Sequence, residues 1–405
     1  MREYPVYTVT PKAEKSLRNG HPWVYGEEVV SMSVQAEDGA LVDVRGPKGA
    51  YLGTGWVNAR SKIRVRVIST NANDAFDEAF WTRRIRYALE YRKTVMGDDF
   101  AACRLIFGES DQFPGLVVDR FDTVLVAQSM SVGIEVRKPM IYRILVEQLR
   151  AMGAHIEALY ERADVNTRDL EGLPKFKSFY EMPGLRTDLN GHVTIVENGL
   201  RFDVNYIDGQ KTGYFLDQKY NRRAVMQLVR GRRVLDCFTH TGAFAIHAAR
   251  GGAAHVTAVD VSQLALDQAR ANAKQNHIHD MDFVCADVFD LLTQRVQQGH
   301  RSDDFIILDP PAFTKSHATA RDAYRGYKEI NLKAMRLLPR GGYLATCSCS
   351  HFMKDDMFRQ MLIEASHDAN VSLRQIEARQ QGPDHPILLN VPETNYLKFY
   401  VFQVV

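Results

Sequence analysis

Residues 234–244 read VLDCFTHTGAF, and this run of strand, turn and helix start indicates the fold class of the 405-residue chain. Its apolar beginning predicts a buried strand that ends at Asp236, and Gly242 opens a helix that we expect to reach Arg250. A strand that leads directly through a glycine-containing turn into a helix is typical of an open α/β sheet. In such a sheet the turn lies at the edge where ligands bind.

The same alternation of strands and helices continues to the end of the chain. Helices of 10–15 residues between strands predict a doubly wound, mostly parallel sheet of seven strands, an α/β Rossmann-like fold. Besides 234–236, we expect strands at 255–260, 283–287, 305–309, 343–349, 371–378 and 397–404. We expect Ser262 to cap the helix that reaches about residue 276.

The N-terminal part has a different pattern. Short apolar runs separated by glycines predict a small β domain at 1–72, and mixed helices and strands predict an α+β domain at 73–188. Within the latter, residues 169–190 are rich in Gly, Pro and charge and are expected to form a loop or linker. The seven-stranded sheet then occupies 189–405.

Basic residues alternate with branched ones along 62–67, so Lys62, Arg64 and Arg66 should share one face of a strand. That face is either solvated or contacts phosphate. We keep Arg64 and Arg66 as candidates for nucleic-acid contact, together with the arginines at positions 83, 84 and 86.

The composition excludes several classes of protein. Hydrophobic residues make up 45% and charged residues 25%, as in soluble globular proteins, and no apolar run is long enough for a membrane span. The net charge of +2 means that affinity for nucleic acid must come from local patches. Five scattered cysteines predict a reducing, cytoplasmic location. The sequence has no cluster of cysteines and histidines that would predict a metal site.

Three consecutive predicted strands end in a carboxylate, at Asp236, Asp260 and Asp287. A pyrophosphate would require a turn with more glycines than Gly242 alone. An acidic strand end instead suits the cationic amino-acid part of S-adenosylmethionine. Asp260 is placed to accept hydrogen bonds from ribose hydroxyls, and Asp287 from an adenine amino group. The turn residues that we assign to this cofactor are Phe238, Thr239, Thr241 and Gly242.

Two other strand ends carry groups for chemistry on a planar base. The turn DPPAF at 309–313 supplies the carboxylate of Asp309, which can hydrogen-bond a ring edge, and the ring of Phe313, which can stack on it. The strand that follows Gly341 and Gly342 contains Cys347 and Cys349.

With these motifs the chain resembles the RlmI/YccW family of bacterial class I methyltransferases, which form 5-methylcytosine in large-subunit ribosomal RNA. Segments 15–24, 108–115, 211–218 and 325–328 carry the resemblance over nearly the whole chain. It implies that 1–72 is a PUA domain, an RNA-binding β barrel, and that 189–405 is the methyltransferase domain. It also implies 23S rRNA as the partner and Gln218 and Asp309 as cofactor residues.

The resemblance further implies a nucleophile. RNA cytosine-5 methyltransferases use a motif similar to GGxLVYSTCS, and its cysteine falls on Cys349, which leaves Cys347 a packing role. Thiolate addition to carbon 6 of cytosine makes carbon 5 reactive, so the chemistry needs an exposed cysteine. Asp309 would stabilise the protonated base, and Lys328 is either near the active site or contacts phosphate. Because no cysteine follows the proline of 309–313, another group must assist product release.

Two alternatives stay open. A purine N-methyltransferase could use the Asp309 turn without a covalent step, and a non-catalytic RNA-binding ribosome assembly factor could retain the fold. Only the cytosine-5 reaction needs the sulfur of Cys349. A small-molecule methyltransferase would leave the N-terminal β domain without a role. The sequence predicts neither a membrane nor a metal partner, and a homodimer is one assembly that this organisation allows.

Overall fold

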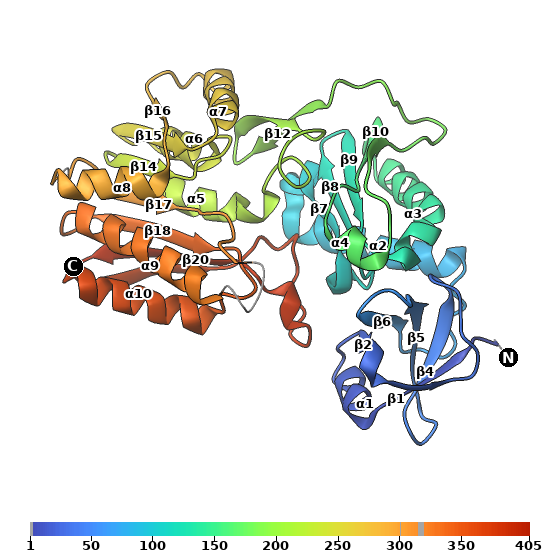
Figure 1. Ribbon diagram of the computed structural model, residues 1–405. Helices are drawn as coiled ribbons and strands as arrows, with labels where there is room; N and C mark the ends of the chain where they lie inside the picture. The colour runs from blue at the N-terminus through green and yellow to red at the C-terminus, as the bar shows by residue number, and fades with distance from the viewer. Residues whose placement is uncertain (1–2, 300, 315–319) are drawn as a thin grey trace. The chain divides into compact units, whose positions relative to one another are not determined.

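The computed structural model describes residues 3–299, 301–314 and 320–405 (Figure 1). The chain forms two compact units that interleave along the sequence. The first comprises Met1–Ile195, Val204–Leu216 and Pro383–Thr394, and the second comprises Val196–Asp203, Asp217–Gly382 and Asn395–Val405. The region predicted as one domain, 189–405, therefore contributes three stretches to the first unit: 189–195, Val204–Leu216 and Pro383–Thr394.

The first unit begins with a six-stranded sheet, ordered β2-β6-β5-β4-β1-β3, whose buried side chains form one core. Helix α1 (Pro11–Arg18) starts here because Thr10 accepts a hydrogen bond from the Ala13 N–H and Pro11 occupies the first turn. The strands are β1 (Val6–Val9), β2 (Trp23–Tyr25), β3 (Val29–Met32), β4 (Leu41–Arg45), β5 (Tyr51–Val57) and β6 (Ile63–Ser69).

A second sheet in this unit has the order β11-β10-β9-β8-β7. Its strands are β7 (Ala102–Phe107), β8 (Leu116–Phe121), β9 (Val124–Ser129), β10 (Ala158–Arg162) and β11 (Lys177–Phe179), and its helices are α2 (Glu78–Met96), α3 (Val132–Ala151) and α4 (Thr167–Glu171). The predicted loop at 169–190 is wrong in part, because it contains β11. This three-residue edge strand is held by pairing with β10 rather than by any pattern of its own. Strands β12 (His192–Glu197) and β13 (Leu200–Asn205) then form a two-stranded sheet.

The second unit contains the seven-stranded sheet, in the order β16-β15-β14-β17-β18-β20-β19. Neighbouring strands from β16 to β18 are parallel, and β20 runs antiparallel to both of its neighbours. This confirms the predicted doubly wound, mostly parallel sheet. The strands are β14 (Arg233–Cys237), β15 (His255–Asp260), β16 (Asp282–Cys285), β17 (Phe305–Leu308), β18 (Tyr343–Ser348), β19 (Leu373–Arg379) and β20 (Lys398–Val404).

Helices α5 to α10 accompany this sheet (Figure 1). Helix α9 packs against α8 and α10, and α6 packs against α5 and α7. The predicted cap is confirmed, since the Ser262 hydroxyl accepts a hydrogen bond from the Ala265 N–H at the start of α7. The helices are α5 (Lys219–Leu228), α6 (Ala243–Arg250), α7 (Gln263–Gln275), α8 (Val288–Gln297), α9 (Ala320–Leu337) and α10 (Asp355–Ala369). Within the described ranges, the chain contains no helix with both the length and the apolar character needed to cross a membrane.

Candidate active site

The site lies where the order of the seven strands reverses. Strand β14 pairs with β15 on one side and with β17 on the other, so successive crossovers leave in opposite directions. Register places Cys237 opposite Leu308, and Leu308 opposite Thr346. The carboxyl ends of β14, β17 and β18 therefore meet at one edge, together with the side chains that follow them.

The turn after β14 is held in an unusual backbone conformation. Phe238, His240 and Gly242 have φ angles of 64°, 51° and 81°. A Cβ atom on Gly242 would lie 2.8 Å from the Cβ atom of Ala269, so both the φ angle and the packing require glycine. No side chain caps α6 at Gly242, so no capping side chain occupies the N-terminal end of this helix. Such a turn suits a ligand with carboxylate and hydroxyl groups.

Asp236 is fully buried beneath this turn. Its Oδ2 atom accepts a hydrogen bond of 2.5 Å from the Thr239 hydroxyl, whereas its Oδ1 atom is buried without a partner among the described residues. Burial raises the pKa of Asp236 to about 7, against the opposing hydrogen bond from Thr239. A buried carboxylate oxygen without a donor fits the amino group of an S-adenosylmethionine molecule.

The other two acidic strand ends are also oriented by backbone groups. Asp260 accepts hydrogen bonds of 2.9 Å from the N–H groups of His240 and Ser262, and its side chain is partly exposed. Asp287 is exposed and caps α8, where it accepts from Phe289 N–H at 2.8 Å. The capping role of Asp287 was missed in the sequence. Contacts of Asp260 with ribose and of Asp287 with adenine remain predictions.

Asp309, Cys347 and Gln218 form one contact group. Asp309 Oδ1 lies 2.9 Å from Cys347 Sγ and 3.2 Å from Gln218 Nε2. Cys347 is 1% exposed, and burial together with the Asp309 charge raises the pKa of its thiol well above the usual value. Burial also raises the pKa of Asp309 to about 6. Cys347 is thus a protonated donor to Asp309, a contact that the sequence did not predict.

Cys349 lies in a different environment. Strand β18 ends at Ser348, one residue earlier than predicted, so Cys349 lies directly after the strand. Its side chain is partly exposed, in contrast to that of Cys347. Opposite Ser348 on β20 is Lys398, which is 6% exposed and was also missed in the sequence. A lysine within the otherwise apolar run LKFYVF at 397–402 was the available signal.

Phe313 belongs to an aromatic cluster beside these strand ends. Its ring centroid lies 4.6 Å from that of Tyr327, 5.7 Å from Phe289 and 6.4 Å from Phe238. A Cβ atom on Gly326 would come within 3.3 Å of the Phe313 ring, so the glycine permits this packing. The cluster joins the turn after β14 to the turn after β17 and leaves Phe313 partly exposed.

Two of the cations predicted to bind RNA have protein partners instead. Arg66 is 9% exposed and donates to Glu171 at 2.6 Å, so the expected exposed cationic face is wrong at this position. The reason is that α4 supplies a carboxylate on that face. Lys328 contacts Asp368 at 2.9 Å and Glu364 at 3.4 Å on α10, which ties two helices together. Arg64 is partly exposed and stays a candidate.

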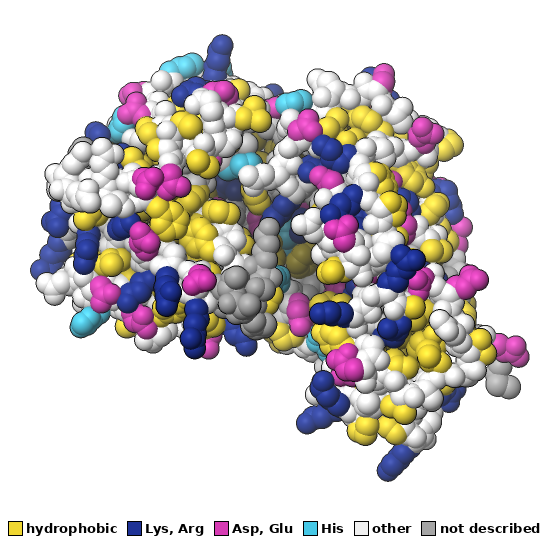
Figure 2. All heavy atoms as spheres, viewed as in Figure 1, with side chains coloured by type: hydrophobic (Ala, Val, Ile, Leu, Met, Phe, Trp, Pro, Cys, Tyr) yellow, Lys and Arg dark blue, Asp and Glu magenta, His cyan; other side chains and the backbone are white. Residues whose placement is uncertain are grey.

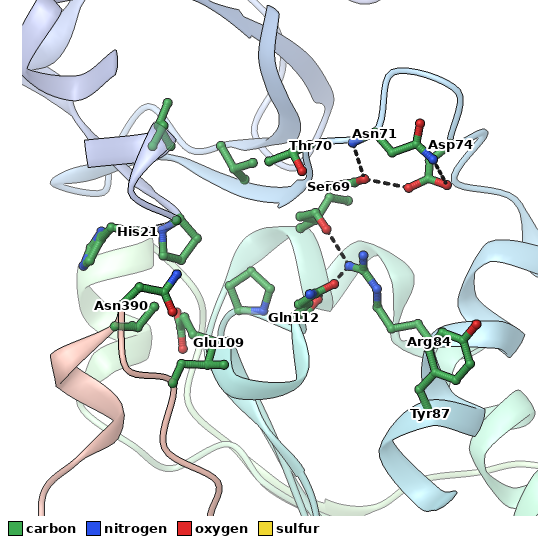
Figure 3. Close-up of a pocket in the computed structure, with 18 of the residues that line it drawn as sticks. His21, Ser69, Thr70, Asn71, Asp74, Arg84, Tyr87, Glu109, Gln112 and Asn390 are labelled. Atoms are coloured by element: carbon green, nitrogen blue, oxygen red, sulfur yellow. Dashed lines mark hydrogen bonds between the residues drawn. The ribbon is translucent and has the colours of Figure 1, made fainter. Parts of the chain in front are cut away.

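The first unit contains a pocket of about 450 Å³ lined by the α1–β2 turn, the end of β6, α2, the β7–β8 turn and residues 388–391 (Figure 3). Arg84 reaches into its wall and donates to the carbonyls of Ile68 at 2.6 Å and Gln112 at 3.0 Å. Burial lowers the pKa of Arg84 to about 10. Arg83 contacts Asp74 at 3.1 Å and Arg86 contacts Glu90 at 3.7 Å. Figure 2 likewise shows basic and acidic side chains interspersed on the visible face.

Comparisons with known proteins match both parts of the chain. The family described as S-adenosylmethionine-dependent methyltransferase matches residues 184–402, and the PUA-like domain family matches residues 8–70. Proteins named ribosomal RNA large subunit methyltransferase I are similar over nearly the full length. The relative from Pseudoalteromonas translucida is 39% identical over 96% of this chain and 97% of its own, and that from Klebsiella pneumoniae strain 342 is 37% identical over 99% and 98%.

Solved structures agree on the fold. A methyltransferase from Streptococcus mutans has a TM-score of 0.82 at 21% identity and covers 98% of this chain and 100% of its own. The SMU.776 protein, solved in complex with SAH, has a TM-score of 0.83 at 21% identity with the same coverage. At this identity the likeness concerns architecture alone.

Proposed function

This chain belongs to the S-adenosylmethionine-dependent methyltransferases that include the ribosomal RNA large subunit methyltransferase I proteins, and we propose that it methylates carbon 5 of a cytosine in 23S rRNA through Cys349. Family membership supports S-adenosylmethionine-dependent methylation of large-subunit rRNA. The observation that carries the finer proposal is a partly exposed thiol, Cys349, directly after a strand whose neighbour leads to Asp309.

The residues that would hold S-adenosylmethionine are those around the turn after β14. The unpartnered Oδ1 atom of Asp236 would accept from the amino group, and Asp260 from the ribose. The N–H groups at the start of α6, next to Gly242, would face its carboxylate. The bound cofactor supplies a methyl group activated by its sulfonium charge. Phe238, Thr239, Thr241, Asp287 and Gln218 complete the set that we assign to it.

Cys349 acts on the base in this proposal. Its thiolate forms a bond to carbon 6, which turns carbon 5 into an enamine-like nucleophile. Asp309 hydrogen-bonds the ring edge and stabilises the extra proton on the base, and its pKa of about 6 suits that task near neutral pH. After methylation, loss of the carbon-5 proton breaks the sulfur–carbon bond and releases the thiolate. Phe313 stacks on the ring.

The environments of the two cysteines favour Cys349 over Cys347 as the nucleophile. A nucleophilic cysteine needs access to the base and an ionisable thiol. Cys347 is buried, and its thiol is held protonated by the adjacent Asp309 carboxylate. Cys349 is the more accessible of the two. We assign Cys347 the role of orienting Asp309.

The first unit is proposed to hold the RNA. The target base must leave any helix to reach a thiol at a strand end, so the substrate is a single-stranded or flipped nucleotide. The PUA-like region and the partly exposed Arg64 are the candidates for backbone contact. We retain domain limits of 1–72, 73–188 and 189–405 as proposals for this division of labour.

The experiment compares wild-type protein with Cys349→Ala and Cys347→Ala, using labelled S-adenosylmethionine and unmodified 23S rRNA. Nucleosides from digested RNA identify the product. We expect 5-methylcytosine from the wild type and from Cys347→Ala at a reduced rate, and none from Cys349→Ala. A methylated purine, or full activity in Cys349→Ala, would reject the covalent mechanism and favour an N-methyltransferase.

A further inference from the structure

Lys398 is a buried cation at the start of β20, opposite the end of the strand that precedes Cys349. Its Cα atom is paired with that of Ser348, the last residue of β18. Its Nζ atom donates to the Ser350 carbonyl at 2.6 Å and to the Tyr396 carbonyl at 2.8 Å. The ammonium group is therefore anchored to the residue directly after Cys349, within the segment that presents the thiol.

These two hydrogen-bond partners do not neutralise the charge of Lys398. Both are carbonyl oxygens, which orient an ammonium group but carry no formal charge. The side chain is 6% exposed, so water screens the charge little. A buried ammonium group without a formal counter-charge is therefore stabilised by a nearby anion.

The titratable groups around Lys398 come from several elements. Cys347 lies near the end of β18 and Cys349 directly after it, Asp355 lies at the start of α10, and Tyr327 on α9 interacts electrostatically with Cys349. Asp355 already accepts a hydrogen bond of 2.5 Å from the Tyr400 hydroxyl. The rings of His351 and Tyr396 lie 5.7 Å apart in the same region. Of the two thiols, Cys347 is a buried donor to Asp309, whereas Cys349 is partly exposed.

The electrostatics of the site agree with this arrangement. Burial lowers the pKa of Lys398 to about 8, and Cys349 contributes the leading opposing influence, ahead of Asp355. Because an interaction between two titrating groups is reciprocal, an ammonium group stabilised by a thiolate also stabilises that thiolate. A cysteine next to a cation ionises more readily than a free one.

We propose that Lys398 is a positioning residue that keeps Cys349 ionised, by holding an ammonium charge against the Cys349–Ser350 segment. This inference rests on the proposed role of Cys349 and extends it to a second residue. It gives β20, the antiparallel strand beside β18, a part in the reaction. It also accounts for a lysine in a buried, otherwise apolar strand.

The test measures the ionisation of Cys349 directly, without RNA. The native protein is treated briefly with iodoacetamide at a series of pH values, and the tryptic peptide 341–354 is fragmented to assign alkylation to Cys349 or Cys347. In the wild type we expect the alkylation rate of Cys349 to rise with a midpoint below the value of about 8.5 of an ordinary thiol. A wild-type midpoint at or above that value overturns the proposal.

Variants then separate charge from structure. Lys398→Met removes the charge, and Lys398→Gln removes the charge but keeps a donor for the carbonyls. We expect either variant, if its thermal unfolding remains cooperative, to move the midpoint up by about one pH unit and to slow alkylation near pH 7 about tenfold. Lys398→Arg should keep the midpoint low. Lys354→Met, which removes an exposed charge five residues beyond Cys349, is the matched control and should not move it; its tryptic peptide is 341–359.

The two proposals fail in different ways. An unchanged midpoint in folded Lys398→Met and Lys398→Gln contradicts the role of Lys398, whatever product the enzyme makes. A shifted midpoint with no 5-methylcytosine from the wild-type enzyme would uphold the role of Lys398 and reject the proposed function.

Discussion

The thiol of Cys347 donates a hydrogen bond to the carboxylate of Asp309 across 2.9 Å, between the ends of two adjacent parallel strands. This contact lowers the pKa of Asp309 against the larger, opposite effect of burial. Cys347→Ala should therefore raise the pKa of Asp309 above about 6. The pH dependence of the single-turnover methylation rate should shift its acidic limb to higher pH. Cys103→Ala, which removes a buried thiol from the first unit, should leave that limb in place.

Gly242→Ala tests the turn after β14. The φ angle of 81° is strained for alanine, and the added Cβ atom would meet Ala269 at 2.8 Å. We expect a loss of about 2–4 kcal/mol in the free energy of unfolding, together with weaker S-adenosylmethionine binding by calorimetry. Gly231→Ala is the matched control, since its φ is 70° but no heavy atom lies within 4 Å of the new Cβ. Equal losses in the two variants would show that packing against Ala269 is unimportant.

Gly326→Ala separates activity from stability. The residue lies in α9, where alanine is favoured over glycine by about 1 kcal/mol, yet the new Cβ atom would press on the Phe313 ring at 3.3 Å. We expect the free energy of unfolding to stay level or rise while methylation falls several-fold and cofactor binding persists. Undiminished methylation by the variant would argue that the position of Phe313 does not matter for the reaction.

Acid should destabilise the second unit through His247. This imidazole is fully buried, donates from Nδ1 to the Ala243 carbonyl at 2.7 Å and lies 3.0 Å from Asn198 Nδ2. Burial lowers its pKa to about 4, so the unfolded chain takes up a proton from about pH 6.5 downward while the folded chain does not. Stability should fall by up to about 3 kcal/mol between pH 6.5 and 4.

The pH dependence of urea unfolding measures this contribution. His247→Gln should flatten the slope over that interval, although its stability at pH 7 will be lower than that of the wild type. The control is His155→Gln, because the His155 side chain is 76% exposed. An identical slope in His247→Gln and the wild type would mean that other groups cause the acid sensitivity.

The buried pair next to His247 should be sensitive to loss of one partner. Arg222 donates to both oxygens of Glu197, at 2.5 and 2.9 Å, and both side chains are almost fully buried. Glu197→Gln leaves an unpaired buried guanidinium and should cost about 3–5 kcal/mol. Glu147→Gln, which weakens an exposed pair with Arg143, should change stability by less than about 1 kcal/mol. Chemical denaturation of both variants measures the difference.

Features set by local pattern were predictable from the sequence. The seven strands, the turn around Gly242 and the Ser262 cap each depend on residues within one or two turns of chain. Features set by distant partners were not. The partner of Arg66 is Glu171, which is 105 positions away in the sequence, so no local pattern predicts their ion pair. The Cys347–Asp309 contact depends on the register between two strands. A lysine is ordinarily expected at the surface, and the burial of Lys398 follows from the pairing of β20 with β18.

The interleaving of the two units has a consequence for synthesis of the protein. The first unit is not complete until Pro383–Thr394 has left the ribosome, and β20, with Lys398, follows only after that segment. A nascent chain that ends before residue 383 thus lacks both the last segment of the first unit and the strand that pairs with β18. We therefore expect both units to reach their native packing only late in synthesis.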